Sequence, residues 1–236
     1  MHPEWQGRMI AAIREAEKSL PNQHLISLNV AHGSARIAKP HPEVSLYNFH
    51  AAKPEAVTLN YGLGKAIGHN ETGGSRREDA TYRIEGWEFI LAGGALFSHL
   101  DFSFAINHPR GTQLDHRGPG GGSPALRQQL RILKEFIHSF EFVKMQPDNS
   151  VIQGGVPEKG RAWALVEPGR AYAIYMVGRG PAELTLELPS GAFRVEWINT
   201  LNGSLDKEES FPHDGGARRL QSPGFAQGIA LRVKAE

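Results

Sequence analysis

The sequence predicts an α/β unit followed by an all-β unit. Over residues 1–142, short apolar runs alternate with segments of helical periodicity, whereas residues 143–236 hold short runs of alternating polarity between turn signals. Strands that alternate with helices favour a parallel sheet, and closely spaced alternating strands favour an antiparallel sandwich. We therefore predict an α/β domain over 1–142 and a β-sandwich domain over 143–236.

Helical periodicity marks the first unit at four places. The expected helices span residues 3–20, 54–63, 78–92 and 124–140. Pro3 suits the first turn of the first helix and Pro21 ends it. Ser123 is a suitable N-cap for the last helix, with Pro124 at its first position.

Polar side chains end each of the expected parallel strands, which span residues 24–33, 44–52, 65–73 and 95–104. The strand endings hold Asn29 and His32, then Asn48 and His50, then His69, Asn70 and Glu71, then His99 and Asp101. Buried polar groups are costly without partners, and the carboxyl ends of parallel strands meet at one edge. This pattern predicts a functional site there, in either a doubly wound sheet or a barrel.

The second unit shows five runs with the two-residue period of strands. They span residues 162–168, 172–178, 182–189, 192–200 and 228–235. Their spacing is typical of an antiparallel sandwich.

Composition excludes several classes of partner and site. The net charge is +1, so neither nucleic acid nor a membrane surface is expected as a partner. The chain has no cysteine, which excludes a disulfide framework, a thiol nucleophile and a cysteine zinc site. Residues 1–20 are amphipathic and do not form a signal peptide, and no apolar run is long enough to span a membrane. The compartment stays unknown, and secretion or a periplasmic location is compatible with the lack of cysteine.

Three segments of the first unit carry a resemblance to known enzymes. VSLYNFHAA (44–52), GHNETGG (68–74) and EGWEFILAGGALFSHLDFSF (85–104) resemble bacterial cellulase-like members of the retaining glycoside hydrolases built on (β/α)₈ barrels. GAFRVEWINTLNGS (191–204) and SPGFAQGIALRV (222–233) resemble the small β-sandwich that follows such barrels, a module often labelled collagen-binding. The resemblance covers nearly the whole chain. It implies the C-terminal half of a TIM barrel, strands 5–8, followed by an antiparallel β-sandwich.

Within that resemblance, Glu71 is the expected catalytic residue. In the clan, an acid/base glutamate ends strand four and a nucleophilic glutamate ends strand seven. One strand-and-helix unit follows Glu71 before the sandwich, so Glu71 would end strand seven and act as the nucleophile. Strands one to four and the acid/base glutamate are then missing. We expect a truncated chain that is inactive unless the missing barrel half is supplied.

The other expected site residues surround Glu71. The expected hydrogen-bond donors to its carboxylate are Tyr47, Asn48, His50, His69 and Asn70. The residues expected to bind sugar hydroxyls are Asn29, His32 and Asp101, and Phe102 adds aromatic surface for a sugar ring.

Each of these assignments has a structural alternative. Glu71 can cap a turn or pair with Arg76 or Arg83. His50 and His69 can be hydrogen-bonded core histidines, and Asp101 can hold the turn after its strand. Trp87 is expected in the core between helix and barrel.

Three functional hypotheses remain open at this point. The first is a glycoside hydrolase with a carbohydrate substrate, and the second is a non-catalytic module that binds a glycan or matrix protein. The third, a metal-dependent hydrolase using His32, His50, His69, His99 and Asp101, lacks any tight ligand spacing, so we predict no metal and no cofactor. Two open sheet edges predict a homo-oligomer, association with the missing barrel half, or poor solubility.

Overall fold

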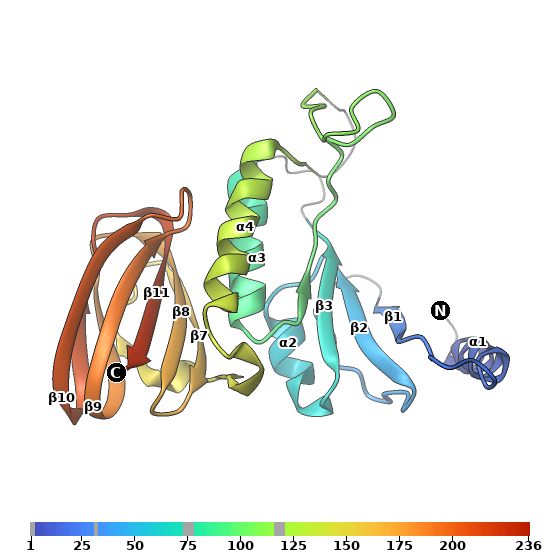
Figure 1. The fold of residues 1–236 in the computed structure, drawn as a ribbon, viewed down its shortest axis with the longest axis horizontal. Coiled ribbons are helices and arrows are strands. Elements are labelled where there is room, and N and C mark those ends of the chain that lie inside the picture. The colour runs from blue at the N-terminus through green and yellow to red at the C-terminus, as the bar shows by residue number, and fades with distance from the viewer. Residues whose placement is uncertain (1–2, 31–32, 73–77, 116–120) are drawn as a thin grey trace.

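The computed structural model describes residues 3–30, 33–72, 78–115 and 121–236. The chain forms a four-stranded parallel sheet in the order β1-β2-β3-β4 and a seven-stranded antiparallel sheet, with helices packed between them (Figure 1). The fold is therefore mixed α/β, with a parallel part followed by an antiparallel part. The division into two domains at residue 143 stays a prediction.

The parallel sheet follows the predicted alternation of strands and helices. Its strands are β1 (Ile26–Val30), β2 (Val44–His50), β3 (Ala66–Glu71) and β4 (Leu96–Phe97). The helices are α1 (Pro3–Ala16), α2 (Glu55–Asn60, continued by the 3₁₀ helix Tyr61–Leu63), α3 (Asp79–Leu91) and α4 (Pro124–His138). The fourth strand is only two residues long, because the chain leaves the sheet after Phe97 for a long connection to α4. None of the described helices is long and apolar enough to cross a membrane.

The cap predicted for the last helix is confirmed. The Ser123 hydroxyl accepts a hydrogen bond from the Leu126 backbone N–H at 2.9 Å, and Pro124 occupies the first turn. The same hydroxyl donates to the Asp79 carboxylate at 2.5 Å. One side chain thus begins α4 and ties it to the first turn of α3.

The antiparallel sheet is larger than the sequence predicts. Its strands are β5 (Gln146–Pro147), β6 (Ile152–Gly154), β7 (Arg161–Glu167), β8 (Ala171–Arg179), β9 (Glu183–Asn199), β10 (Leu205–Gln221) and β11 (Ala226–Ala235). Two predicted strands form the single strand β9, which continues through Pro189–Gly191 instead of ending there. Strand β10 pairs with β9 along its length at the edge of the sheet. An edge position tolerates Pro212, which would break a ladder inside the sheet.

The middle strands of this sheet are buried on both faces. In β8, Ile174 and Met176 point into the core enclosed by the antiparallel sheet, while Ala173 and Tyr175 pack toward α3 and α4. This explains the nearly continuous apolar run of β8, since a strand covered on both sides needs no polar face.

Helix α3 lies between the two sheets and contributes to both cores (Figure 1). Trp87 is fully buried and its ring stacks on Tyr175 of β8 at a centroid distance of 5.2 Å. Phe89, on another face of the helix, packs into the core of the parallel sheet. The prediction that Trp87 belongs to the core is confirmed.

A partly buried ion pair also joins α3 to the antiparallel sheet. The Glu88 carboxylate accepts hydrogen bonds from Arg161 Nε at 2.6 Å and Nη2 at 3.1 Å, and from Trp163 Nε1 at 3.3 Å. Glu88 is 6% exposed, so these donors replace the water that a carboxylate loses on burial.

Trp87 gives a direct test of this shared core. We expect Trp87→Ala to lower the free energy of unfolding by about 3–5 kcal/mol, because it removes a large buried side chain and leaves a cavity. The matched control is Trp5→Ala, since Trp5 is 53% exposed and its replacement should cost less than about 0.5 kcal/mol. Urea unfolding measures both. Equal losses for the two variants would contradict the assignment of Trp87 to the core.

Candidate functional site

The two faces of β2 have opposite characters. Tyr47 and Phe49 are buried in the core that the parallel sheet forms with the helices. Asn48 and His50 alternate with them and therefore lie on the opposite face, called here the inner face. On β3 Gly68 shares this face, because a Cβ built on it would lie 2.2 Å from Asn48 Oδ1.

A β-bulge brings Glu71 onto the inner face. Phe49 pairs with His69, but the next pair is His50 with Glu71, so Asn70 is the extra residue. In a regular strand, Glu71 would point toward the core on the same side as His69, because the two residues are two positions apart. An extra residue of this kind re-aims the side chains that follow it. The bulge therefore aligns Glu71 with His50 at the carboxyl end of the sheet.

The His50 side chain holds the Glu71 carboxylate. His50 Nδ1 lies 3.0 Å from Glu71 Oε2, and the Glu71 side chain is 45% exposed. Ala51, which follows His50 in the chain, has a φ of 49° and donates its backbone N–H to the Glu71 carbonyl at 2.8 Å. A non-glycine residue in this left-handed region is strained, and such strain persists where the surroundings enforce it, often at functional sites.

Asn48 is fixed beside this pair. Its Nδ2 donates to Ser27 Oγ at 2.8 Å, and it pairs in register with Asn29 of β1, which is exposed. Within the described residues, the buried atom Asn48 Oδ1 has no hydrogen-bond partner. Sequence reasoning missed Ser27 and Gly68. The two-residue period that places Ser27 on the face of Asn29 was the available signal.

Three of the other buried polar atoms that lack a hydrogen-bond partner among the described residues lie at the strand endings. They are His50 Nε2, Asn70 Oδ1 and His99 Nε2. With Asn48 Oδ1, they belong to the residues predicted from the strand endings. Buried polar atoms of this kind are uncommon and call for a ligand, a water or another protein segment.

The prediction that His69 donates to the Glu71 carboxylate is wrong. His69 is 1% exposed and lies on the core side, with its ring 5.2 Å from Phe89 and 5.7 Å from Phe97. Its Nε2 accepts the Ala52 backbone N–H at 3.3 Å. Burial lowers the pKa of His69 to about 4, although a hydrogen bond with the Glu71 backbone opposes the shift. His69 is thus a neutral core histidine beneath the site, the alternative considered from the sequence.

Tyr47 is likewise not a site residue. It is 3% exposed and its hydroxyl accepts the His41 backbone N–H at 2.8 Å. The two-residue period places it on the core side, whereas the prediction grouped it with neighbours that point the other way.

Asp101 holds the turn after β4. Its Oδ1 accepts from Ser103 N at 3.0 Å and Ser103 Oγ at 2.5 Å, and its Oδ2 accepts from Arg127 Nη1 at 3.0 Å. Burial raises the pKa of Asp101, but the bonds from Ser103 and Arg127 outweigh this effect and keep the pKa below its ordinary value. The structural alternative for Asp101 is confirmed, and its carboxylate is already engaged.

The remaining predicted residues are less closely tied to Glu71. His99 packs its ring 4.9 Å from that of Tyr82, and burial lowers its pKa. Phe102 is 38% exposed. His32 and Arg76 lie outside the described residues. Arg83 donates to Gln129 and Gln227, so it does not pair with Glu71.

No group of three potential metal ligands occurs among the residues that the structure describes. The histidines expected to converge do not share a face, because His69 points into the core and His50 to the inner face. The described part of the site is therefore built from Glu71, His50, Asn48 and Asn29 on one face of the sheet.

Comparison with known proteins identifies similar folds but no related sequence. No protein-family model and no curated protein matches the chain. A structure described as a glycoside hydrolase matches 99% of the chain with a TM-score of 0.72 at 17% identity. A glycoside hydrolase family 5 protein from Bacteroides vulgatus matches 95% with a TM-score of 0.67 at 15% identity. A family 30 subfamily 8 xylanase from Clostridium acetobutylicum matches 82% with a TM-score of 0.50 at 11% identity.

These matches establish a fold similar to that of family 5 and family 30 glycoside hydrolases. The chain covers 61% and 58% of the first two proteins, so it spans about three fifths of their length. None of the comparisons shows a collagen-binding module.

The buried neutral state of His69 predicts a pH-dependent stability. In the unfolded chain His69 takes up a proton near pH 6.5, whereas the folded pKa is about 4. Between these values the unfolded state binds more protons. The contribution of His69 is therefore complete above pH 6.5 and is lost as the pH falls toward 4, by up to about 3 kcal/mol.

Urea unfolding between pH 4 and 7 measures this effect. His69→Gln should flatten the pH dependence, with a residual slope from His99, whose pKa burial also lowers. His138→Gln, at an exposed position on α4, should keep the parent slope. An unchanged slope in His69→Gln would show that His69 does not titrate as a buried group.

Proposed function

We propose that this chain carries the nucleophile of a retaining glycoside hydrolase, an enzyme that cleaves O-glycosidic bonds of a carbohydrate substrate. The observation that carries the proposal is the bulge at Asn70, which aligns Glu71 with His50 at the carboxyl end of a parallel sheet. The fold similarity to family 5 and family 30 enzymes supports the same reaction class. Active sites of sheets and barrels of this kind lie at that end of the strands.

The reaction would run in two displacements. A Glu71 oxygen attacks the anomeric carbon while a second carboxylic acid protonates the departing glycosidic oxygen, which leaves a glycosyl ester on Glu71. The second carboxylate then takes a proton from water, and the water oxygen displaces Glu71 from the sugar. Retaining enzymes place the two carboxyl groups about 5–5.5 Å apart.

The residues around Glu71 have roles that fit this scheme. His50 orients the nucleophile through its contact at 3.0 Å. The unused polar atoms of Asn48 and Asn70, together with exposed Asn29, are suited to sugar hydroxyls. Phe102 offers an apolar surface for the ring.

Asp101 is the other carboxylate at the described strand endings, and we do not assign it as the second carboxylic acid. Asp101 is a poor candidate, because Ser103 and Arg127 occupy its oxygens and its lowered pKa keeps it ionised. A general acid needs a raised pKa instead.

The alternative is a non-catalytic module that binds a glycan or matrix protein. It is favoured by the engagement of the Asp101 carboxylate with Ser103 and Arg127, since Asp101 is the other carboxylate at the described strand endings. In that case Glu71 would contribute a hydrogen bond to the ligand, and no covalent step would occur.

The nucleophile can be tested without the general acid. A 2,4-dinitrophenyl β-glycoside has a leaving group that departs without protonation, so Glu71 alone should release one equivalent of dinitrophenolate in a burst. Mass spectrometry should find one glycosyl unit on a peptide containing Glu71. Glu71→Gln should lose the burst rate by at least about a thousandfold.

Glu78→Gln is the matched control, since Glu78 is exposed at the start of α3 and makes no capping hydrogen bond. It should behave as the parent. If neither the parent nor the variants release dinitrophenolate, but the parent and Glu78→Gln bind immobilised glycans and Glu71→Gln binds them more weakly, the binding-module alternative replaces the hydrolase.

A further inference from the structure

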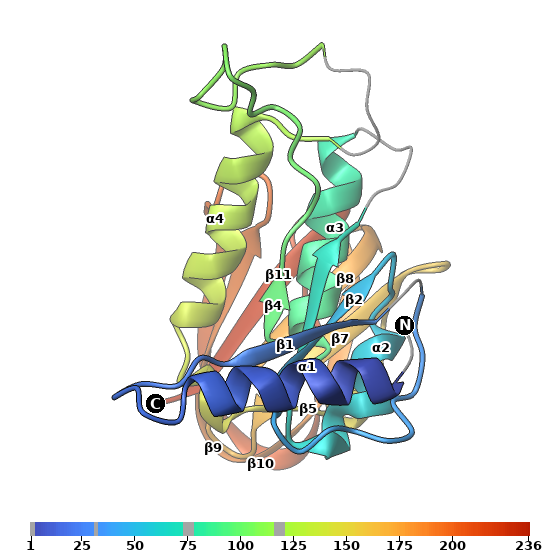
Figure 2. The same ribbon diagram turned by 90° about the vertical axis from the view of Figure 1, so that its right-hand side faces the viewer.

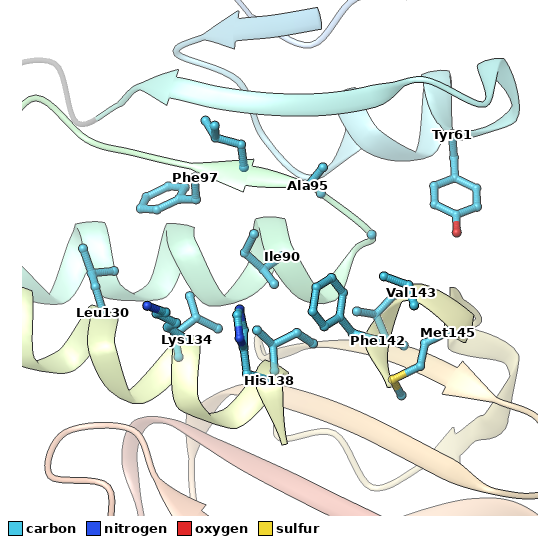
Figure 3. A pocket seen from close by; sticks show the side chains of 16 residues that line it. Tyr61, Ile90, Ala95, Phe97, Leu130, Lys134, His138, Phe142, Val143 and Met145 are labelled. Atoms are coloured by element: carbon cyan, nitrogen blue, oxygen red, sulfur yellow. The ribbon is translucent and has the colours of Figure 1, made fainter. Parts of the chain in front are cut away.

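Two of the hollows in the described part of the chain lie beside α3, and their linings differ in chemistry. One, of about 550 Å³, opens between β4, the end of α3 and α4, and apolar side chains such as Phe97, Leu130 and Val143 line it (Figure 3). The other, of about 430 Å³, is called here the α2–α3 hollow and is lined by charged and polar side chains as well. Its volume falls within the range of about 300–1,000 Å³ that is typical of small-molecule sites.

The α2–α3 hollow lies on the core side of the parallel sheet. The start of α2, one side of α3 and the first residues of β7 form its walls, and the buried ring of His69 belongs to its lining. Figures 1 and 2 show α2 and α3 on the side of the parallel sheet that faces the antiparallel strands. Glu71 and His50 lie on the opposite, inner face, so the sheet separates this hollow from them.

The charged side chains of the α2–α3 hollow balance one another. The cations are Lys53 and Arg161, and the carboxylates are Glu55, Glu85 and Glu88. Arg161 donates to the Glu88 carboxylate at 2.6 Å, and Glu55 acts on the same guanidinium electrostatically. A ligand with a net charge of either sign would meet side chains of its own sign. The lining therefore favours a neutral ligand that can pair with cations and carboxylates alike.

Trp163 gives the hollow an aromatic wall. Its side chain is half-buried, and its Nε1 donates to Glu88 Oε1 at 3.3 Å, which fixes one edge of the indole. Thr81, on the first turn of α3, adds a hydroxyl to the same lining. An aromatic face packs against C–H groups, and a hydroxyl group both donates and accepts hydrogen bonds. A sugar ring presents C–H groups on its faces and hydroxyls around its edge, so it matches both features.

We propose that the α2–α3 hollow is an accessory binding site for a neutral saccharide. The sugar hydroxyls would pair with Lys53, Glu55 and Thr81, while a C–H face of the ring packs on Trp163. This site goes beyond the proposed function, because it lies across the sheet from Glu71 and requires no hydrolysis. It would hold the chain on a glycan whether or not Glu71 reacts.

The indole N–H groups give a local readout of this site. The chain has four tryptophans, of which Trp163 lines the hollow, whereas Trp5 lies on α1 and Trp197 in the core of the antiparallel sheet. Two-dimensional NMR spectra of the isotope-labelled Glu71→Gln variant, in which turnover is excluded, record these groups. Methyl β-glycosides of glucose, xylose, galactose and mannose are each added to about 20 mM, enough to occupy most of a site with a Kd of about 1 mM. Glycerol and glycine serve as a non-sugar polyol and a zwitterion, and Trp163→Phe assigns the Trp163 signal.

At least one glycoside should shift the Trp163 signal in a saturable way and leave those of Trp5 and Trp197 unchanged. Ala80→Phe, which fills the hollow from the first turn of α3, should abolish the shift. Ala12→Phe, at an exposed position on α1, is the matched control and should keep it. Glu55→Gln, at an exposed position of the lining, should raise the Kd at least about threefold, because a neutral amide replaces a charge-assisted hydrogen bond.

An unshifted Trp163 signal with all four glycosides would overturn the proposal, and so would an equal shift with glycerol or glycine. Glycoside-induced shifts confined to inner-face residues such as Asn48 and His50 would also overturn it, yet would leave the proposed role of Glu71 intact. The titration without a lining variant decides these outcomes even if Ala80→Phe does not fold. A saturable shift that both Ala80→Phe and Glu55→Gln leave unchanged would place the sugar outside the hollow.

Discussion

The fold depends on helix α3 being buried from two sides. Trp87 faces the antiparallel sheet and Phe89 faces the parallel sheet, so one helix serves two hydrophobic cores. Its polar residues must then find partners inside the protein. Glu88 finds Arg161 and Trp163 of β7, and Arg83 finds Gln129 of α4 and Gln227 of β11. Because α3 is held on both sides, the strand that precedes it, which ends at Glu71, has a fixed support.

The position of Glu71 follows from a conflict between strand period and packing. A regular β3 would point residues 67, 69 and 71 into the core, where a carboxylate would lack water and a partner. His69 can remain there, because burial lowers its pKa and a neutral imidazole both donates and accepts hydrogen bonds. The bulge at Asn70 resolves the conflict for the next residue, which leaves the core and meets His50. The same extra residue leaves Asn70 Oδ1 without a described partner.

The order of helices and strands in the first half was predictable, because apolar periodicity reports which faces are buried. The cap at Ser123 was predictable from local chemistry. Strand β10 was not, since it lies at a sheet edge with one buried residue, Leu220, and carries almost no apolar signal. For the site, strand endings identified the correct edge of the sheet but not the face. Tyr47 was assigned to the wrong face of β2, because it alternates with Asn48 and therefore points into the core. Glu71 reaches the inner face through a bulge, which the apolar periodicity of the sequence does not reveal.

The polar inner face and the apolar sheet ends have one physical origin. Each strand of the parallel sheet has a core face that the helices cover, and an opposite face on which Asn29 is exposed and Asn48 keeps an unused oxygen. Exposed apolar side chains lie at both ends of the strand order, Trp5 and Met9 on α1 beside β1 and Leu96 on β4 itself. Both features follow from the strand order: within the described residues, a sheet of four strands leaves polar atoms unused on its inner face and apolar side chains exposed at its two ends.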